Sequence, residues 1–388
     1  MKFTKLSLIA ALAVTSAMAG ESTITGDAKV FYGTTDAKEW TGALATHTSN
    51  DHNLFNKTSS YGNAAISLDY SRDIADGVTL NAGMTGVSTL GLEDTLVSDT
   101  WVNHSLKDRA WIDVANVTAK LGNTTAVIGR QKLDTPLAFT ETWNIAENTF
   151  DAFTFVNSDV TNTTLVASVV TRANGGEFEN LNAGMGDLGE AIYAFGAVSK
   201  ITPTITAQGW YYNVASSDDK VWLQADAEVA KGITAGLQYA QTIADVGDDT
   251  SAIAGKLAYD ANGMGLYAAY SKVDDKGTAG NKFANYAGYG MSNLYTEAWW
   301  NFGFVSKPGA QTIALGASAE MNGLALTAQY NDVTNDSNAD VDEMSEVTVT
   351  ATKKVGPVDA TLAFINTSSD TDIDGNTVQA YLTVPFSL

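Results

Sequence analysis

Apolar and polar positions alternate strictly in many short segments of the chain. In residues 221–229 every odd-numbered residue is Val, Leu or Ala, whereas the even-numbered residues are Trp222, Gln224, Asp226 and Glu228. The last segment, 376–387, alternates in the same way. Successive side chains of a β-strand point to opposite faces. Each such segment therefore predicts a strand with one apolar and one polar face.

The segments are joined alternately by short turns and by long acidic loops. Turn residues such as Asp76-Gly77 and Asn322-Gly323 occupy short connections, and long connections include 33–60, 273–310 and 332–344. This asymmetry is typical of an all-β, antiparallel transmembrane β-barrel. A soluble β-sandwich also alternates, so export and strand number must decide between the two. The predicted strands, about 18 in number, are 22–32, 61–70, 78–90, 109–120, 124–131, 150–157, 163–172, 191–202, 204–214, 221–229, 232–241, 252–260, 264–272, 311–321, 323–331, 345–354, 357–367 and 376–387.

The aromatic stretch 295–305 is predicted to be a loop rather than another strand. Counting it as a strand would place the Asn322-Gly323 turn and the acidic 332–344 loop on the wrong ends of the barrel. Trp299-Trp300 also breaks the alternation. We expect this stretch to fold over the barrel mouth or to pack at a subunit contact.

The N-terminus carries an export signal. Residues 1–19 combine two lysines, an apolar stretch and the Ala17-Met18-Ala19 cleavage pattern, so a signal peptide is predicted over 1–19 and a single barrel domain over 20–388. No later run of eighteen apolar residues occurs. The mature chain is thus either a soluble exported protein or a β-barrel, the other backbone that can cross a bilayer.

Composition excludes several functional classes. The chain has no cysteine, which excludes a disulfide framework and a thiol nucleophile. Removal of the two lysines in residues 1–19 leaves 20 basic against 44 acidic residues, a net charge of −24, so nucleic acid is not expected as a partner. No catalytic fingerprint occurs, and we expect the protein not to be an enzyme.

Three motifs resemble a known family. They are Gly-Arg-Gln-Lys-Leu-Asp-Thr-Pro-Leu at 129–137, Glu-Asn-Thr-Phe-Asp-Ala at 147–152, and Thr-Thr-Leu at 163–165. They resemble the OprD-like porins, most closely the major outer membrane porins of campylobacter-like (epsilonproteobacterial) bacteria. The resemblance implies a homotrimeric channel in the bacterial outer membrane, in contact with lipid and lipopolysaccharide. It also implies diffusion of small hydrophilic solutes and ions, with a preference for cations.

The same resemblance implies that the connection 132–149 folds inward and narrows the pore. Two departures from the family pattern bear on this. Residues 144–150 lack the arginine and proline of the wider family, which favours a nonspecific, acid-lined pore over specific carboxylate uptake. The chain ends Phe386-Ser387-Leu388 instead of on the usual terminal aromatic residue, although Phe386 and Leu388 share a face.

Charged residues are the candidate functional groups. Carboxylates at a narrow passage with low-dielectric walls favour cations and repel anions. Ordinary solvation of a loop is the alternative for each loop residue. The candidates for the constriction are Arg130, Lys132, Asp134, Glu141 and Glu147, and those for the pore wall are Asp27, Lys29, Asp69, Asp113, Asp226 and Glu228.

Metal binding has little support. Asp370 to Gly375 matches half of an EF-hand loop, but its twelfth position is Tyr381, so an acidic turn is predicted, with weak calcium binding as the alternative. His47, His52 and His104 lie in predicted loops without zinc-ligand spacing. No cofactor and no metal are expected. The alternative function is a surface adhesin or structural barrel with a blocked lumen. A hydrolase would need a Ser/His/Asp set at the wall, and the loop placement of all three histidines argues against it.

Overall fold

The computed structural model of the chain describes residues 22–37, 39–42, 45–48, 53–97, 108–174, 191–214, 218–276, 283–286, 290–335, 343–369 and 373–388. Three sets of residues discussed above lie outside these ranges. They are the predicted signal peptide, the histidines His52 and His104, and the acidic residues Asp370 and Asp372.

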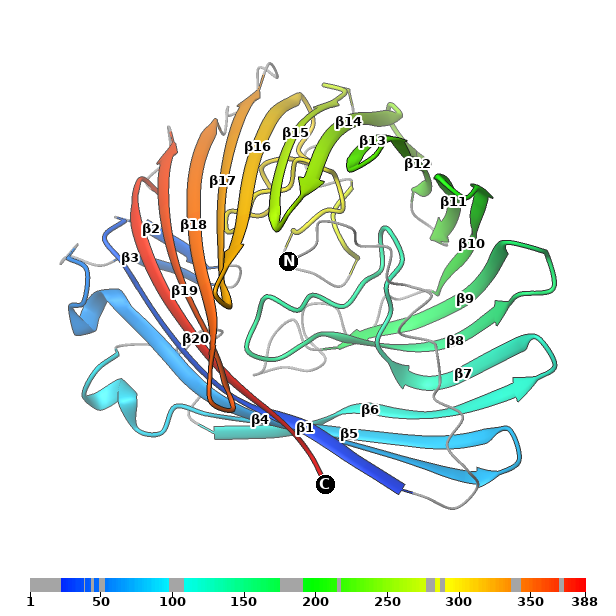
Figure 1. Cartoon of the computed structure of the whole chain (residues 1–388), viewed down its shortest axis with the longest axis horizontal. Coiled ribbons are helices and arrows are strands. Elements are labelled where there is room, and N and C mark those ends of the chain that lie inside the picture. Colours follow the sequence, from blue (N-terminus) through cyan, green and yellow to red (C-terminus); the bar gives the residue numbers. More distant parts are fainter. Residues whose placement is uncertain are drawn as a thin grey trace.

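The described residues form a closed, all-β barrel of 18 antiparallel strands. Each strand pairs with its neighbours along the chain, and β1 closes the barrel by pairing with both β4 and β20 (Figure 1). The strands are β1 (Ser22–Thr35), β4 (Ser60–Ala75), β5 (Val78–Ser88), β6 (Asp108–Leu121), β7 (Thr124–Gln131), β8 (Thr149–Asn157), β9 (Thr163–Asn174), β10 (Ile192–Thr202), β11 (Ile205–Val214), β12 (Asp219–Ala230), β13 (Ile233–Ile243), β14 (Thr250–Ala261), β15 (Met264–Val273), β16 (Ala310–Met321), β17 (Leu324–Asn335), β18 (Met344–Val355), β19 (Val358–Ser369) and β20 (Gly375–Ser387).

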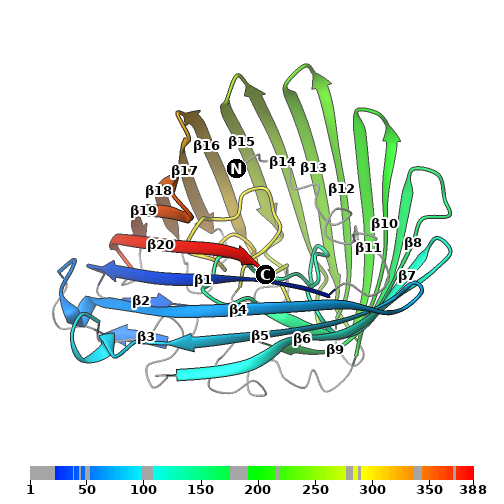
Figure 2. The same ribbon diagram turned by 60° about the horizontal axis from the view of Figure 1, so that its bottom comes forward.

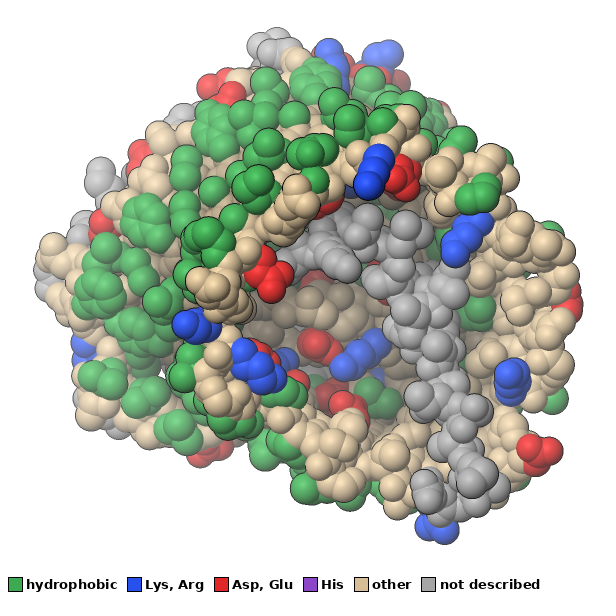
Figure 3. All heavy atoms as spheres, viewed as in Figure 1, with side chains coloured by type: hydrophobic (Ala, Val, Ile, Leu, Met, Phe, Trp, Pro, Cys, Tyr) green, Lys and Arg blue, Asp and Glu red, His purple; other side chains and the backbone are tan. Residues whose placement is uncertain are grey.

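Alternation divides the wall into an apolar outer face and a polar lumen. In β12, Trp222 is buried inside while Leu223 is exposed outside. In β18, Glu346 and Thr348 are buried inside, whereas Val347 is exposed outside. Figure 3 shows apolar side chains over the outer wall and charged side chains inside the opening. This is the pattern of a barrel that meets hydrocarbon outside and water inside.

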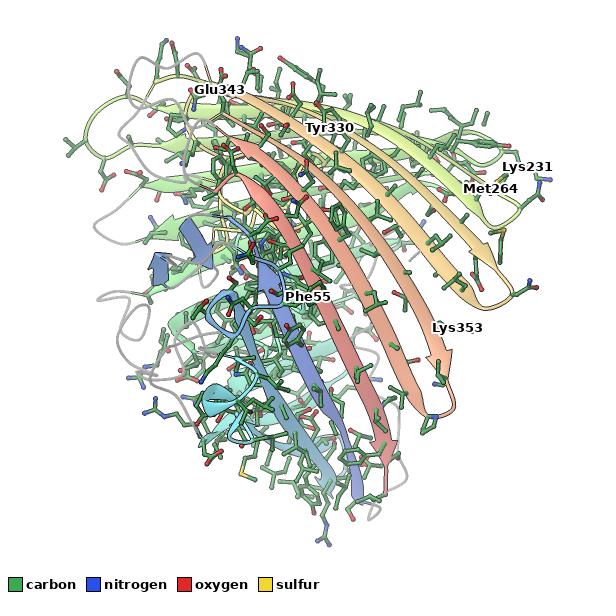
Figure 4. The ribbon with its side chains drawn as sticks, turned by 90° about the vertical axis from the view of Figure 1, so that its left-hand side faces the viewer. Phe55, Lys231, Met264, Tyr330, Glu343 and Lys353 are labelled. Atoms are coloured by element: carbon green, nitrogen blue, oxygen red, sulfur yellow. The ribbon has the colours of Figure 1, made fainter. Side chains whose placement is uncertain are left out.

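The two ends of the barrel differ. One end, the short-turn rim, carries tight turns such as Asn322-Gly323, where both residues have positive φ (52° and 71°) as a two-residue hairpin turn requires. The opposite end, the long-loop rim, carries the long connections. Figure 4 shows Lys231 and Met264 at the short-turn rim and Glu343 at the other end. Figure 2 shows the strands tilted between the two rims.

The prediction of about 18 strands is confirmed. Several strands extend further than their alternation indicated, because ladder pairing continues into polar residues such as Ser71 to Asp73 at the end of β4. The predicted loop 33–60 contains a two-stranded hairpin, β2 (Glu39–Gly42) and β3 (Ala45–Thr48), and a 3-10 turn, η1 (Lys57–Ser59). A second 3-10 turn, η2 (Leu92–Asp94), follows β5. Among the described residues, no helix is long and apolar enough to span a membrane.

Two arginine substitutions in β16 test the assignment of residues to the outer and inner faces of the barrel. Leu315 is exposed on the outer face in mid-strand, whereas Ser318 lies on the inner face. Leu315→Arg should lower the stability of the folded barrel by about 2–4 kcal/mol, because it places a charge in hydrocarbon. Ser318→Arg should assemble normally. The fraction of heat-resistant folded barrel on gels is the measurement, and equal tolerance of both variants would contradict the assignment.

Candidate functional site: two inward segments and an acidic wall

The segment 132–148 runs across the inside of the barrel. Its first part is a small hairpin, in which Thr140 N donates to Leu133 O (2.7 Å) and Asp134 bridges to Phe139. The tip is buried, and Leu137 N donates to the hydroxyl of Tyr212 on β11 (3.3 Å). Figure 1 shows this segment inside the ring of strands. Buried apolar residues therefore hold the loop within the lumen.

Glu141 stabilises this segment from within. Its side chain is only 2 % exposed. Its two oxygens accept hydrogen bonds from Asn285 Nδ2 (2.9 Å) and Trp143 Nε1 (2.8 Å), and its backbone N donates to Asn148 Oδ1 (2.6 Å). A carboxylate held in this way fixes the loop and presents little charge to a solute. We do not retain Glu141 as a constriction charge.

A second segment, 290–309, also lies inside the barrel, and the prediction that 295–305 is not a strand is confirmed. The polar lumen faces of several strands hold it. Tyr295 donates to Asp226 Oδ1 (2.7 Å) and its backbone N donates to Gln238 Oε1 (3.0 Å). The Asn331 amide donates to Thr296 O (2.7 Å). This stretch folds into the lumen instead of lying over the mouth.

Glu346 is the strongest anchor of the second segment. Its carboxylate, buried on the lumen face of β18, accepts from the backbone N of Trp299 (2.9 Å), Trp300 (3.1 Å) and Asn301 (2.8 Å). It also accepts from the Asn301 amide (2.8 Å). Converging N–H groups stabilise a buried carboxylate and are themselves satisfied by it.

The two inward segments contact each other. Residues 283–286, which precede the second segment, also bind the first, since Asn285 Oδ1 accepts from Phe139 N (3.0 Å) and its Nδ2 donates to Phe139 O (2.7 Å). Asn293 donates to Pro136 O (2.9 Å). The Trp143 ring packs edge-on against Trp300, with ring centroids 6.0 Å apart. Together they form one unit inside the lumen that is attached to several sides of the wall.

Glu297 lies within the second segment and is buried. Burial raises the pKa of its carboxyl to about 8, although hydrogen bonds from Ser292 and from the backbone N of Ala298 lower it. The Ser292 backbone N donates at 2.6 Å. We call the segment docked when it lies bound inside the barrel. The docked segment holds a proton at neutral pH, whereas an undocked segment, with an ordinary carboxyl pKa near 4.5, does not.

Docking of the second segment should consequently depend on pH. Between about pH 4.5 and 8 the docked form binds more protons, so docking should weaken as the pH rises and should stay constant above the docked pKa. We expect brief conductance fluctuations in single channels to become more frequent from pH 5 to pH 8.5. Glu297→Gln should flatten this dependence. Identical pH profiles for the variant and the wild type would contradict the assignment.

An acidic wall lies on β1, β4 and β6. Asp27 and Asp69 face the lumen by alternation, and Asp113 is buried at a β-bulge of β6. Lys29 is ion-paired with Asp27 (3.5 Å). Asp69 and Asp113 converge over Gly83 of β5, because a Cβ on that glycine would meet their Oδ1 atoms at 2.7 and 2.6 Å. The register pairs Asp69 directly with Gly83, whereas Asp113 is the extra residue of a β-bulge and has no direct partner.

Lys132 and Glu147 stand at the base of the first inward segment and form an ion pair of 2.5 Å. Burial disfavours the charged form of Lys132, but the carboxylates of Glu147, Asp69 and Asp113 outweigh it and raise the pKa of the lysine. The base of the segment and the acidic wall therefore lie in one electrostatic field. Five predicted residues come together at the base of the first inward segment: Asp27, Asp69, Asp113, Lys132 and Glu147. Lys29 lies beside them through its ion pair with Asp27.

Arg130 belongs to a different surface. It forms a two-pronged ion pair with Asp151 of β8 (2.8 and 3.2 Å). On their strands these residues share a face with Ile128 and Phe153, which are 43 % and 47 % exposed on the outside. Alternation therefore directs Arg130 outward, and we do not retain it as a constriction residue.

The remaining predicted residues lie apart from the acidic wall. Asp134 is exposed on the first inward segment. Asp226 lies on β12 and is bound by Tyr295. Glu228 is exposed near the short-turn rim, where its Oε1 accepts from Gly232 N (3.4 Å).

Sequence reasoning missed several lumen residues. Glu346 and Lys256 lie at inward positions of correctly predicted strands, so alternation alone could have identified them. Lys220 lies just before the predicted start of its strand, at a lumen-facing position of β12, and its ammonium lies 4.4 Å from the ring centre of Tyr286. The Lys256 ammonium lies 4.1 Å from the ring centre of Tyr295. No sequence signal pointed to Asn285.

Among the described residues, no group of three or more His, Cys, Asp or Glu side chains could hold a metal ion.

Comparison with known proteins shows a shared architecture. No family model and no curated protein matches the sequence. Pseudomonas aeruginosa OccK8 (OprE) superposes with a TM-score of 0.74 at 15% identity, over 96% of this chain and 100% of the other. Acinetobacter baumannii OccAB1 gives 0.76 at 14% identity, over 96% and 98%. Pseudomonas aeruginosa OpdK, whose structure holds vanillate, gives 0.75 at 14% identity, over 96% and 100%.

The chain has the fold of these Occ and Opd proteins. The match extends over nearly the whole of each chain, so it includes the barrel and its closure. At such low identity the likeness establishes the fold alone. The narrower resemblance to the porins of campylobacter-like bacteria stays a prediction.

Proposed function

We propose that the protein is an OprD-like outer-membrane channel for passive diffusion of small hydrophilic solutes and ions. The observation that carries the proposal is the division of the closed barrel into an apolar outer face and a charged lumen, narrowed by two inward segments. Such a lumen supplies a polar path through hydrocarbon, and side chains at its narrowest part select among solutes.

We further propose a preference for cations. The acidic wall and the base of the first segment contain four carboxylates, those of Asp27, Asp69, Asp113 and Glu147, and the two ammonium groups of Lys29 and Lys132, a net charge of −2. In a confined passage this excess attracts cations and repels anions. Assembly as a homotrimer surrounded by lipid and lipopolysaccharide is part of the same proposal and follows from the motif resemblance.

Solute flux into proteoliposomes tests the channel. Liposomes containing the purified protein should swell in arabinose, a small uncharged sugar, and much more slowly in the tetrasaccharide stachyose. Protein-free liposomes and liposomes with heat-denatured protein are the controls. Absence of swelling in arabinose would refute diffusion through the lumen.

One observation favours a second candidate, a structural or adhesive barrel with a blocked lumen. The inward segments bring large aromatic rings into the lumen, with Trp143 against Trp300 and against Phe302 at a ring-centroid distance of 5.1 Å. The same swelling assay separates the two functions, because a blocked barrel admits neither sugar. The charged side chains visible in the opening in Figure 3 favour the channel.

A further inference from the structure

The lumen wall contains a notch over Gly83 of β5, flanked by two carboxylates. Because Gly83 has no side chain, Asp113 Oδ1 and Asp69 Oδ1 lie where its Cβ would meet them, at 2.6 and 2.7 Å. The third neighbour is Val114 Cβ at 3.0 Å. Two carboxylate oxygens therefore approach the Gly83 backbone closely and lie near each other.

Asp113 is only partly satisfied by the protein. Its Oδ2 accepts from the Thr85 hydroxyl, but its Oδ1 is buried and has no hydrogen-bond partner. The residue as a whole is 8 % exposed. A buried carboxylate oxygen without a donor is costly, and a bound cation is one way to remove that cost.

The surroundings favour a positively charged occupant. Asp27 lies on β1, which pairs with β4, the strand of Asp69, and its Oδ1 also lacks a hydrogen-bond partner. Lys132, whose positive charge reaches Asp69 and Asp113, is already ion-paired with Glu147 at 2.5 Å. With two ammonium groups against four carboxylates, the cluster keeps an excess of negative charge for a diffusing cation.

We propose that the Gly83 notch is a binding site for a small cationic group, either an alkali ion or the primary ammonium of a permeating solute. The inference rests on the proposed channel function and deepens it, because it replaces a diffuse preference for cations with a defined and saturable site. Asp113 and Asp69 supply the charge, and Gly83, which has no side chain, lets their oxygens come close enough to hold one cation between them.

The substitution Gly83→Ala tests the site without changing any charge. The added methyl group would meet both carboxylate oxygens at less than 3.0 Å and would force them apart. Gly86→Ala, on the same strand, is the matched control, since its Cβ would meet its nearest atoms at 3.7 Å or more. Asp113→Asn is a second test that keeps the shape and removes the charge.

The measurement is single-channel conductance as a function of concentration, in potassium chloride and separately in methylammonium chloride. Wild type and Gly86→Ala should saturate. Gly83→Ala and Asp113→Asn should each raise the half-saturating concentration about tenfold, equivalent to about 1.4 kcal/mol of lost binding. An effect in both salts identifies a general cation site, and an effect in methylammonium alone identifies an ammonium site.

Three results would overturn the inference. They are linear conductance in wild type, saturation unchanged in both test variants, and saturation that emerges only at alkaline pH, which would mean that a proton occupies the notch. The reversal potential from the same recordings separates the two proposals. A cation-selective channel that shows no saturable site contradicts only the inference, whereas an anion-selective or absent channel contradicts the proposed function as well.

Discussion

Neutralising three carboxylates of the constriction should reverse its charge selectivity. In the triple variant Asp69→Asn, Asp113→Asn, Glu147→Gln, the local cluster keeps Asp27, Lys29 and Lys132, so its net charge changes from −2 to +1. Each unit charge contributes roughly 0.5–1 kcal/mol to an ion about 4–8 Å away in water. The ratio of potassium to chloride permeability should therefore fall about tenfold or more. The reversal potential in a salt gradient measures this ratio.

A matched triple variant at the long-loop rim controls for total charge. Asp245→Asn, Asp248→Asn and Glu343→Gln remove the same number of charges from exposed positions. Those charges are screened by salt and lie outside the constriction. The rim variant should keep wild-type selectivity. Equal shifts in the two triple variants would place selectivity outside the acidic wall.

Removal of the Glu346 carboxylate should release residues 299–301 of the second inward segment and widen the channel. In Glu346→Ala, the backbone N–H groups of Trp299, Trp300 and Asn301 lose their acceptor. Breaking a buried charged network of this kind costs about 3–5 kcal/mol, enough to release residues 299–301 from the wall, while the bonds of Tyr295 to β12 and β13 hold the start of the segment in place. We expect a larger mean conductance and more open-channel noise.

Two further variants separate docking from charge. Glu320→Ala removes one negative charge from the lumen face of β16 near the short-turn rim, away from the segment, and should leave the noise unchanged. Glu346→Gln keeps an acceptor oxygen and should give an intermediate effect. Wild-type conductance and noise in Glu346→Ala would show that the segment does not depend on this anchor.

The wall was predictable because its signal is local. A period of two along each strand is enough to place Asp69 and Asp226 in the lumen, and the parity of short and long connections excluded 295–305 as a strand. The same rule applied to Ile128 would have directed Arg130 outward. Its assignment to the constriction came from its place next to the loop motif and not from its own strand.

The arrangement inside the lumen was not predictable because it depends on contacts between distant residues. Glu141 is bound by Asn285, 144 positions later in the chain. Glu346 is bound by a segment 45 to 47 positions earlier. Such contacts leave no periodicity, and an acidic residue in a loop looks the same whether it faces water or closes a buried network. The Gly83 notch also needs the register of three neighbouring strands.

Single-channel recording of the wild-type protein in a planar bilayer, under a gradient of potassium chloride, tests the central claim most directly. An open lumen narrowed by an acidic constriction predicts discrete conductance steps and a reversal potential displaced toward that of potassium. Discrete steps with a reversal potential displaced toward chloride would contradict the acidic constriction. A folded, membrane-inserted barrel that passes no current would contradict the channel itself.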